Sequence, residues 1–167
     1  MPMSLPFISD NPRELGIARI IDAPRAIIWR CWTEPDLHKQ WFCPKPWWVS
    51  VVEYDLRPGG RSFVRMHGPD GEQMDLPGQF LDVVPGERLQ FTDAFGGDWR
   101  PGAGPPFMVG VVALEDAPDG GTLMRWSARH WSDEAKEQHL AMGFEQGWGS
   151  CAEQLEDLAQ RVAKGEA

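Results

Sequence analysis

Hydrophobic and polar positions divide the chain into a run of strands between two helical regions. Ile28 and Trp32, four positions apart, mark one face of a short helix over 24–33, and Pro35 ends it and begins a second short helix that runs to about residue 41. Apolar and β-branched runs, separated by turns rich in Gly and Pro, predict about seven strands. The expected strands are 14–21, 48–56, 61–67, 72–84, 88–93, 107–115 and 122–131.

The C-terminal part of the chain has helical periodicity instead. From Ser132 to about Ala163, apolar residues recur at spacings of three and four, which predicts one continuous helix of about 30 residues with Ser132 as its cap. Such a helix is about 45 Å long, and in a domain of this size only a curved sheet can cover its apolar stripe. Because strands and helices are segregated, we expect an α+β fold with an antiparallel sheet wrapped around this helix.

The chain is expected to form one domain over 14–163, preceded by a flexible leader, 1–13, that is rich in Pro, Ser and Asn. Within the domain, the strand 72–84 is expected to bend at Pro77-Gly78. A proline inside a strand removes a ladder donor, and the following glycine permits a bulge.

Composition narrows the class of protein. The 167 residues carry 16 basic and 25 acidic side chains, a formal net charge of −9. This acidic balance argues against a nucleic-acid partner, which requires clustered Lys and Arg. No apolar stretch reaches the length of a membrane span, and the first ten residues lack the features of a signal peptide. With three scattered cysteines in addition, the chain is expected to be cytoplasmic, with no membrane partner.

Aromatic residues are unusually abundant, with nine Trp and eight Phe beside a single Tyr. Rings of this size form either a very aromatic core or a hollow lined with rings. Alternate side chains of a strand share a face, so Met124, Trp126 and His130 are expected to point inward together, as are Leu89 and Phe91. For any one of these residues, plain core packing is the commoner role. The predicted ligand-binding residues are Trp47, Met66, Met74, Phe80, Trp99, Met108, Trp126, His130, His139, Gly143 and Phe144.

A long loop over 94–106 contains four Gly and three Pro. Loops of this length are commonly lids or binding loops, so Trp99 at its centre is expected either to close over a cavity or to lie on the surface. Gly143, Gly147 and Gly149 interrupt the expected long helix. Each glycine indicates either close contact with the sheet or space left for a bound molecule.

The polar candidates are few. His130 is the best of them, and His139, one to two turns into the long helix, is placed to approach it near the cavity mouth. A histidine on an apolar face is nevertheless more often a satisfied core residue than a base or a ligand. No spacing of Cys and His resembles a zinc site, so we expect no metal and no cofactor.

Several segments, taken in order, resemble the activator of Hsp90 ATPase-like (AHSA1-like) branch of the Bet v 1/START-like (SRPBCC) superfamily. The resemblance covers about 14–160, and it implies a helix-grip fold with a cavity between the curved sheet and the long helix. It implies no reaction, because members of this superfamily bind, transport, cyclise or assist. The matching segments are Asp22-Ala23-Pro24 with Ile28-Trp29, Trp41, 55–60, 66–71, 78–89, 120–122, and Gly147-Trp148 with Leu155.

The leading functional hypothesis is therefore the binding of a small hydrophobic molecule in that cavity. One alternative is a co-chaperone of the Hsp90 type, suggested by the family name alone; single-domain relatives need not bind a chaperone, so such a partner is not favoured. Another is a cyclase or hydrolase, for which His130, His139, Asp75 and Asp82 are the visible acid–base groups; catalysis is also the less favoured expectation. The Trp47-Trp48 pair would allow two copies to associate as a homodimer.

Overall fold

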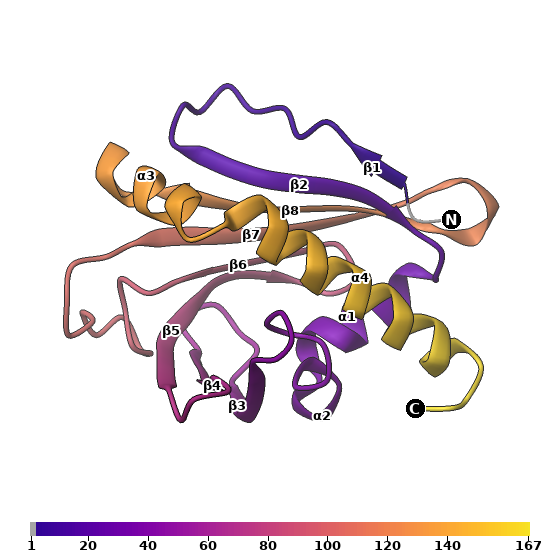
Figure 1. Cartoon of the computed structure of the whole chain (residues 1–167), viewed down its shortest axis with the longest axis horizontal. Coiled ribbons are helices and arrows are strands. Elements are labelled where there is room, and N and C mark those ends of the chain that lie inside the picture. Colours follow the sequence, from indigo (N-terminus) through magenta and orange to yellow (C-terminus); the bar gives the residue numbers. More distant parts are fainter. Residues whose placement is uncertain (1–2) are drawn as a thin grey trace.

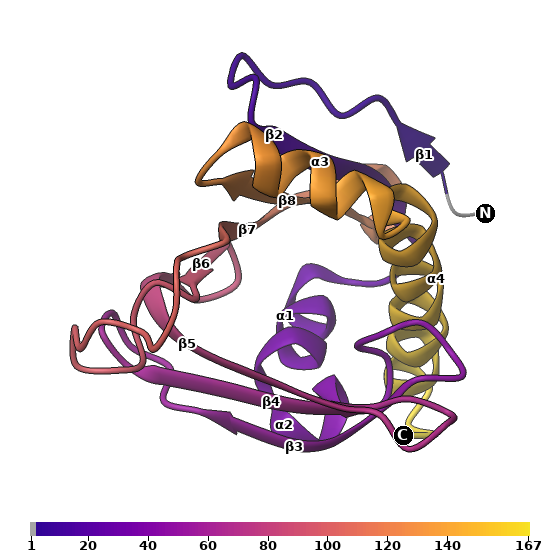
Figure 2. The same cartoon turned by 60° about the vertical axis from the view of Figure 1, so that its left-hand side comes forward.

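Eight strands form one strongly curved antiparallel sheet in the computed structural model, which describes residues 3–167 (Figures 1 and 2). The strands lie in the order β1-β2-β8-β7-β6-β5-β4-β3. The elements are β1 (Met3–Leu5), β2 (Glu14–Ile21), α1 (Arg25–Thr33), α2 (Pro35–His38), β3 (Trp48–Tyr54), β4 (Arg61–His67), β5 (Gln73–Val84), β6 (Arg88–Thr92), β7 (Met108–Asp116), a 3₁₀ turn (Pro118–Gly120), β8 (Thr122–His130), α3 (Asp133–Ala141) and α4 (Phe144–Ala163).

The α+β, helix-grip architecture expected from the sequence is confirmed, with one strand more than expected. The additional strand, β1, lies within the segment 1–13 that was expected to be a leader. It pairs antiparallel with β2, where Leu5 lies opposite Ala18. None of the described helices is long and apolar enough to cross a membrane.

The prediction of one continuous C-terminal helix is wrong, because the chain turns between α3 and α4 (Figure 2). Gly143 has a φ of +84°, a left-handed conformation that glycine adopts readily and other residues rarely do. Ser132 caps α3 as expected, by accepting a hydrogen bond from the Ala135 N–H at 3.1 Å. The long axis of α4 therefore begins at Phe144, and α3 lies separately against the end of β8.

The expected bulge at Pro77-Gly78 is also misplaced. The register of β5 shifts between Phe80 and Asp82, whereas Pro77 pairs regularly with Phe63 of β4. Pairing with β6 begins only at Gln79. Pro77 therefore lies where β5 has a neighbour on one side only, which is where a strand tolerates proline. This change of partners leaves the first half of β5 without a neighbour toward β6.

The main core fills the space between the sheet and α4. Trp126 of β8 stacks on Trp148 of α4, with ring centroids 4.1 Å apart, and Trp32 of α1 meets Trp126 edge-on at 5.0 Å. Leu155 and Leu158 of α4 are fully buried in the same cluster. Protein side chains thus fill the space between the sheet and α4.

Candidate functional site

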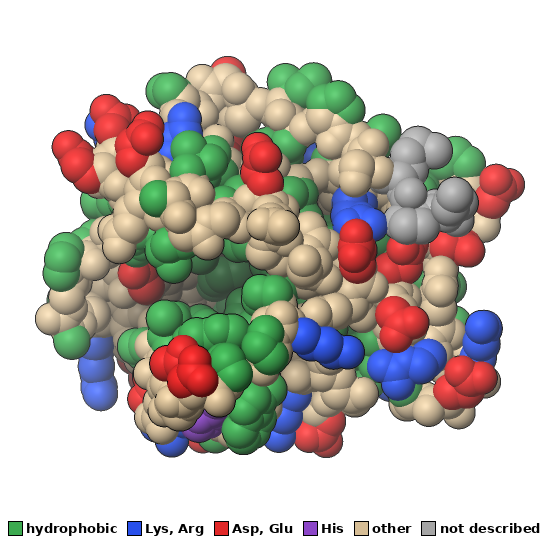
Figure 3. Space-filling model, viewed as in Figure 1, with side chains coloured by type: hydrophobic (Ala, Val, Ile, Leu, Met, Phe, Trp, Pro, Cys, Tyr) green, Lys and Arg blue, Asp and Glu red, His purple; other side chains and the backbone are tan. Residues whose placement is uncertain are grey.

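A cavity of about 520 Å³ lies between α1–α2, the strands β4 to β6 and the long loop that follows β6. Aromatic rings from three sides form most of its inner wall. In Figure 3 a hollow bordered by hydrophobic side chains opens on the viewed face of the molecule. The rings that line the cavity are Trp32, Phe42, Tyr54, Phe80, Phe91, Phe95 and Phe107.

The cavity exists because β5 changes partners. Leu76, Pro77 and Gly78 lie in the half of β5 that has no neighbour toward β6, and all three line the cavity. The loop between β6 and β7 covers this gap, and it contributes 95–96 and 101–105 to the lining.

Hydrogen bonds at both ends and in the middle hold this loop in place. The Asp93 carboxylate accepts the Phe107 N–H at 3.0 Å, at the far end of the loop. The Gly102 N–H donates to the Ala94 carbonyl at 2.8 Å. Gln79 of β5 accepts the Trp99 N–H through its Oε1 atom, also at 2.8 Å. The loop is therefore an ordered wall of the cavity.

Three polar side chains of the lining, Asp75, Thr92 and Asp93, have hydrogen-bond partners within the protein. Asp75 forms a two-pronged ion pair with Arg65, at 2.7 and 3.0 Å, and this guanidinium holds the pKa of the Asp75 carboxyl below its usual range. The Thr92 hydroxyl donates to the Met108 carbonyl at 3.0 Å. Within residues 3–167, no Lys or Arg lines the cavity.

His38, at the end of α2, differs from these three side chains. It is 1 % exposed, and neither ring nitrogen has a hydrogen-bond partner among the described residues. Burial lowers the pKa of His38 to about 3. The Cys31 carbonyl, as a nearby hydrogen-bond acceptor, raises this pKa by a smaller amount. The same carbonyl already accepts the Trp41 indole N–H at 2.8 Å. The imidazole is therefore neutral at physiological pH.

The rings around His38 hold it in place. Its imidazole stacks on Phe42 at 4.6 Å and lies 5.4 Å from Tyr54 and 5.7 Å from Trp32, measured between ring centroids. The indole Nε1 of Trp32 is also buried without a partner in the described part of the chain. Burial raises the pKa of Tyr54, so this phenol stays protonated. Uncharged groups thus form the inner end of the cavity.

The structure places two of the eleven predicted binding residues, Phe80 and Met108, in the lining of this cavity. Trp126 and Phe144 lie in the aromatic cluster around Trp148, where the Phe144 and Trp148 rings are 4.3 Å apart. Gly143 forms the turn before α4.

The other predicted residues lie around the cavity rather than in its lining. Trp47 and Met66 pack against a second, smaller core cluster that contains Val49 and Val52. Met74 of β5 is 41 % exposed, and Trp99 in the loop is 55 % exposed.

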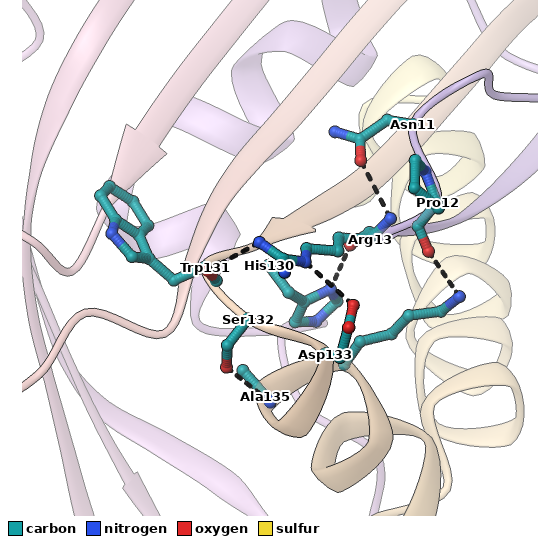
Figure 4. Close-up of polar contacts among 9 residues, drawn as sticks. Asn11, Pro12, Arg13, His130, Trp131, Ser132, Asp133 and Ala135 are labelled. Atoms are coloured by element: carbon teal, nitrogen blue, oxygen red, sulfur yellow. Dashed lines mark hydrogen bonds and ion pairs between the residues drawn. The ribbon is translucent and has the colours of Figure 1, made fainter.

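His130 and His139 are brought together, as the sequence suggested, but they bind each other and do not line the cavity. Because the Arg13 carbonyl can only accept, His130 donates to it through Nδ1 at 2.8 Å (Figure 4). His130 Nε2 then accepts the proton of His139 Nδ1, also at 2.8 Å. Burial, with a smaller electrostatic contribution from the neighbouring His130, lowers the pKa of His139 to about 4. The pair joins β8 to α3, and Phe107 packs on both rings.

Sequence reasoning missed the part of the cavity that α1 and α2 provide. Periodicity placed Trp32 on the face of a short helix, and it did not single out His38 or Phe42. Their spacing of four is the one signal that could have placed them on the same side. Whether these side chains line a cavity depends on the half of β5 that has no neighbour toward β6. The sequence does not show where this unpaired half lies.

Comparison with known proteins places this architecture in a family. The family model of the activator of Hsp90 ATPase homolog 1-like proteins matches residues 22–160. No curated protein matches the chain.

Solved structures from several bacteria share the fold. A crystal structure of a protein from Nitrosomonas europaea is 36% identical over 94% of this chain and 99% of that chain, with a TM-score of 0.87. A protein from Mycobacterium smegmatis is 29% identical over 93% of this chain and 96% of that one, with a TM-score of 0.77. Since the family model spans most of its length, the chain belongs to the family of activator of Hsp90 ATPase homolog 1-like proteins.

Proposed function

We propose that the protein binds a small, mostly apolar molecule in the cavity between α1–α2, β4 to β6 and the 94–106 loop. The observation that carries this proposal is the hollow itself, of about 520 Å³ and walled by aromatic rings. Cavities of about 300–1,000 Å³ with apolar walls and few polar groups are typical of small-molecule sites. The helix-grip fold, which binds ligands at the family level, supports the same function.

The nature of the wall favours flat, ring-containing ligands. Phe42 comes from the segment after α2, Phe80 from β5 and Phe91 from β6, and their ring faces and edges pack well with an aromatic ligand. Met108, at the start of β7, adds a flexible side chain that adapts to the shape of what is bound.

The test is calorimetric titration of the protein into dissolved naphthalene, with two variants of β5. Leu76 and Met74 lie on the same face of β5 and are 37 % and 41 % exposed, so both positions tolerate a larger ring, but only Leu76 lines the cavity. We expect Leu76→Trp to fill the entrance and weaken naphthalene binding by about tenfold or more. Met74→Trp should leave it unchanged.

Two results would count against the function. One is the absence of naphthalene binding to the wild-type protein, and the other is an equal loss of binding in both variants. The second result would place the ligand outside the cavity.

The acid–base groups that a cyclase or hydrolase would use have other partners. Asp82 pairs with Arg88, and Asp75 pairs with Arg65. His130 and His139 are bonded to each other. No observation on these groups favours catalysis over binding, and the family description supplies a chaperone connection by name only.

A further inference from the structure

Two residues at the inner end of the cavity carry polar atoms that no group of the described residues satisfies. Among the described residues, the buried polar side-chain atoms without a partner include the Trp32 Nε1 atom and both ring nitrogens of His38. Both residues line the cavity. Buried polar groups are nearly always hydrogen-bonded in folded proteins, so neighbouring orphans at one end of a hollow need an explanation.

These orphan atoms define the chemistry of a partner. A neutral imidazole has one N–H donor and one bare nitrogen that accepts, whereas an indole only donates. The ring centroids of Trp32 and His38 are 5.7 Å apart. We expect a single ligand oxygen lodged between the two rings to form one hydrogen bond of about 2.9 Å to each of them. A hydroxyl group suits both, because it accepts from the indole N–H and donates to the bare imidazole nitrogen.

The charges around the cavity limit the ligand further. Asp75 and Asp93 line its outer part, and no cationic Lys or Arg side chain joins them among residues 3–167. An anion would meet carboxylates on entering and an uncharged imidazole at the inner end. A fully apolar ligand would enter, but it would leave Trp32 and His38 unsatisfied.

We propose that the cavity selects uncharged aromatic compounds with one hydroxyl group, which is held between the indole N–H of Trp32 and the imidazole of His38. This proposal rests on the proposed function, since it names the class of ligand for the same cavity. His38 is the residue that determines specificity, and the surrounding rings bind the hydrocarbon part of the ligand.

The experiment compares four probes with one ring system. 2-Naphthol carries the hydroxyl, naphthalene lacks it, 2-methoxynaphthalene keeps only the acceptor oxygen, and 2-naphthoate carries a negative charge. Calorimetry on the whole protein should show that 2-naphthol binds about tenfold more tightly than naphthalene. 2-Methoxynaphthalene should fall between them, and 2-naphthoate should bind most weakly.

Three variants assign this preference to His38. His38→Phe keeps the ring but removes both nitrogens, and it should abolish the tenfold preference while naphthalene still binds. His38→Gln restores a donor and an acceptor and should recover part of the preference. His67→Phe is the matched control, because His67 of β4 lies outside the cavity and bonds Ser50 at 2.7 Å; it should behave as the wild type does.

A spectroscopic measurement on the wild-type protein does not depend on any variant. Correlation of the ring ¹⁵N and ¹H signals of His38 should show a change at the bare nitrogen when 2-naphthol is added, and none when naphthalene is added.

Equal affinity of the wild-type protein for naphthalene and 2-naphthol would overturn this proposal while leaving the proposed function intact. Tighter binding of 2-naphthoate, or a preference that survives in His38→Phe, would overturn it as well. If neither neutral probe binds, the proposed function itself fails, and the proposal fails with it. Should His38→Phe not fold, the probe series and the ring ¹⁵N signals of the wild-type protein decide the question.

Discussion

Replacing His38 by Phe should stabilise the protein that is free of ligand, and the gain should grow as the pH falls. At pH 7 the substitution removes two buried nitrogens without partners, a gain of about 1–3 kcal/mol. The larger ring has a steric cost of similar size in a tightly packed core. Here the ring borders a cavity of about 520 Å³, which gives it room, so we expect a net gain of about 1 kcal/mol in the free energy of unfolding.

The effect of pH follows from the direction of the pKa shift. Burial lowers the pKa of His38 from 6.5 to about 3, so the unfolded chain binds a proton that the folded protein excludes. The contribution of neutral His38 to the free energy of unfolding of the wild-type protein is therefore complete above pH 6.5 and is lost progressively as the pH falls toward 3. At pH 5 the loss is about 2 kcal/mol. Phenylalanine does not titrate, and the groups common to both proteins, including Tyr54 and His139, cancel in the difference.

Urea unfolding, followed by tryptophan fluorescence at pH 7 and pH 5, measures this difference. The advantage of His38→Phe over the wild type should rise from about 1 kcal/mol to about 3 kcal/mol, with equal denaturant slopes. An advantage that stays constant between the two pH values would refute the reasoning, because it would mean that His38 is able to take up a proton in the folded state.

Three further predictions concern the turn before α4, the contact between β8 and α3, and the attachment of the 94–106 loop. Gly143→Ala places a side chain at a φ of +84° and should destabilise the protein by about 1–2 kcal/mol in urea unfolding. Gly149→Ala, inside α4 with open space around the added methyl group, should stabilise it by about 0.5–1 kcal/mol. If both substitutions changed stability in the same direction, this would contradict the left-handed turn at Gly143. His139→Leu leaves the buried Nε2 of His130 without its donor and should cost about 1–3 kcal/mol at pH 7. Because the pKa of His139 is lowered to about 4, the wild-type protein should lose the stability that this side chain contributes as the pH falls from 6.5 to 4. Thermal scans of the variant should show a smaller loss of stability over the same pH range. Asp93→Ala releases the far end of the loop and should weaken naphthalene binding severalfold in calorimetry, and unchanged affinity would show that the loop is not part of the site.

The sequence predicted most strands closely because Gly or Pro turns separate most of them. It predicted the strand 61–67 with the same bounds as β4. The inward positions of β8 also agree with the structure, since Met124 and Trp126 are buried and Arg125 is exposed. Local signals of this kind depend on neighbouring residues, so one sequence is enough to show them.

The errors have a common physical origin in tertiary structure. Three glycines stand near the start of α4, and no local signal shows that Gly143, and not Gly147 or Gly149, takes the left-handed conformation. The position of the cavity depends on where β5 exchanges β4 for β6, which is a matter of register between distant segments. The sequence therefore placed the hollow beside the C-terminal helix, whereas the structure places it beside α1 and α2.

The position of the polar end of the cavity has a consequence for how such proteins diversify. Trp32, His38 and Phe42 lie within a single short stretch of chain, whereas the sheet that completes the cavity is assembled from remote segments. On the proposal above, a change in the preference for a hydroxyl group requires exchange of one contiguous piece, about 32–42, with no alteration of strand pairing. Grafting that piece between members of the family would test whether the preference moves with it.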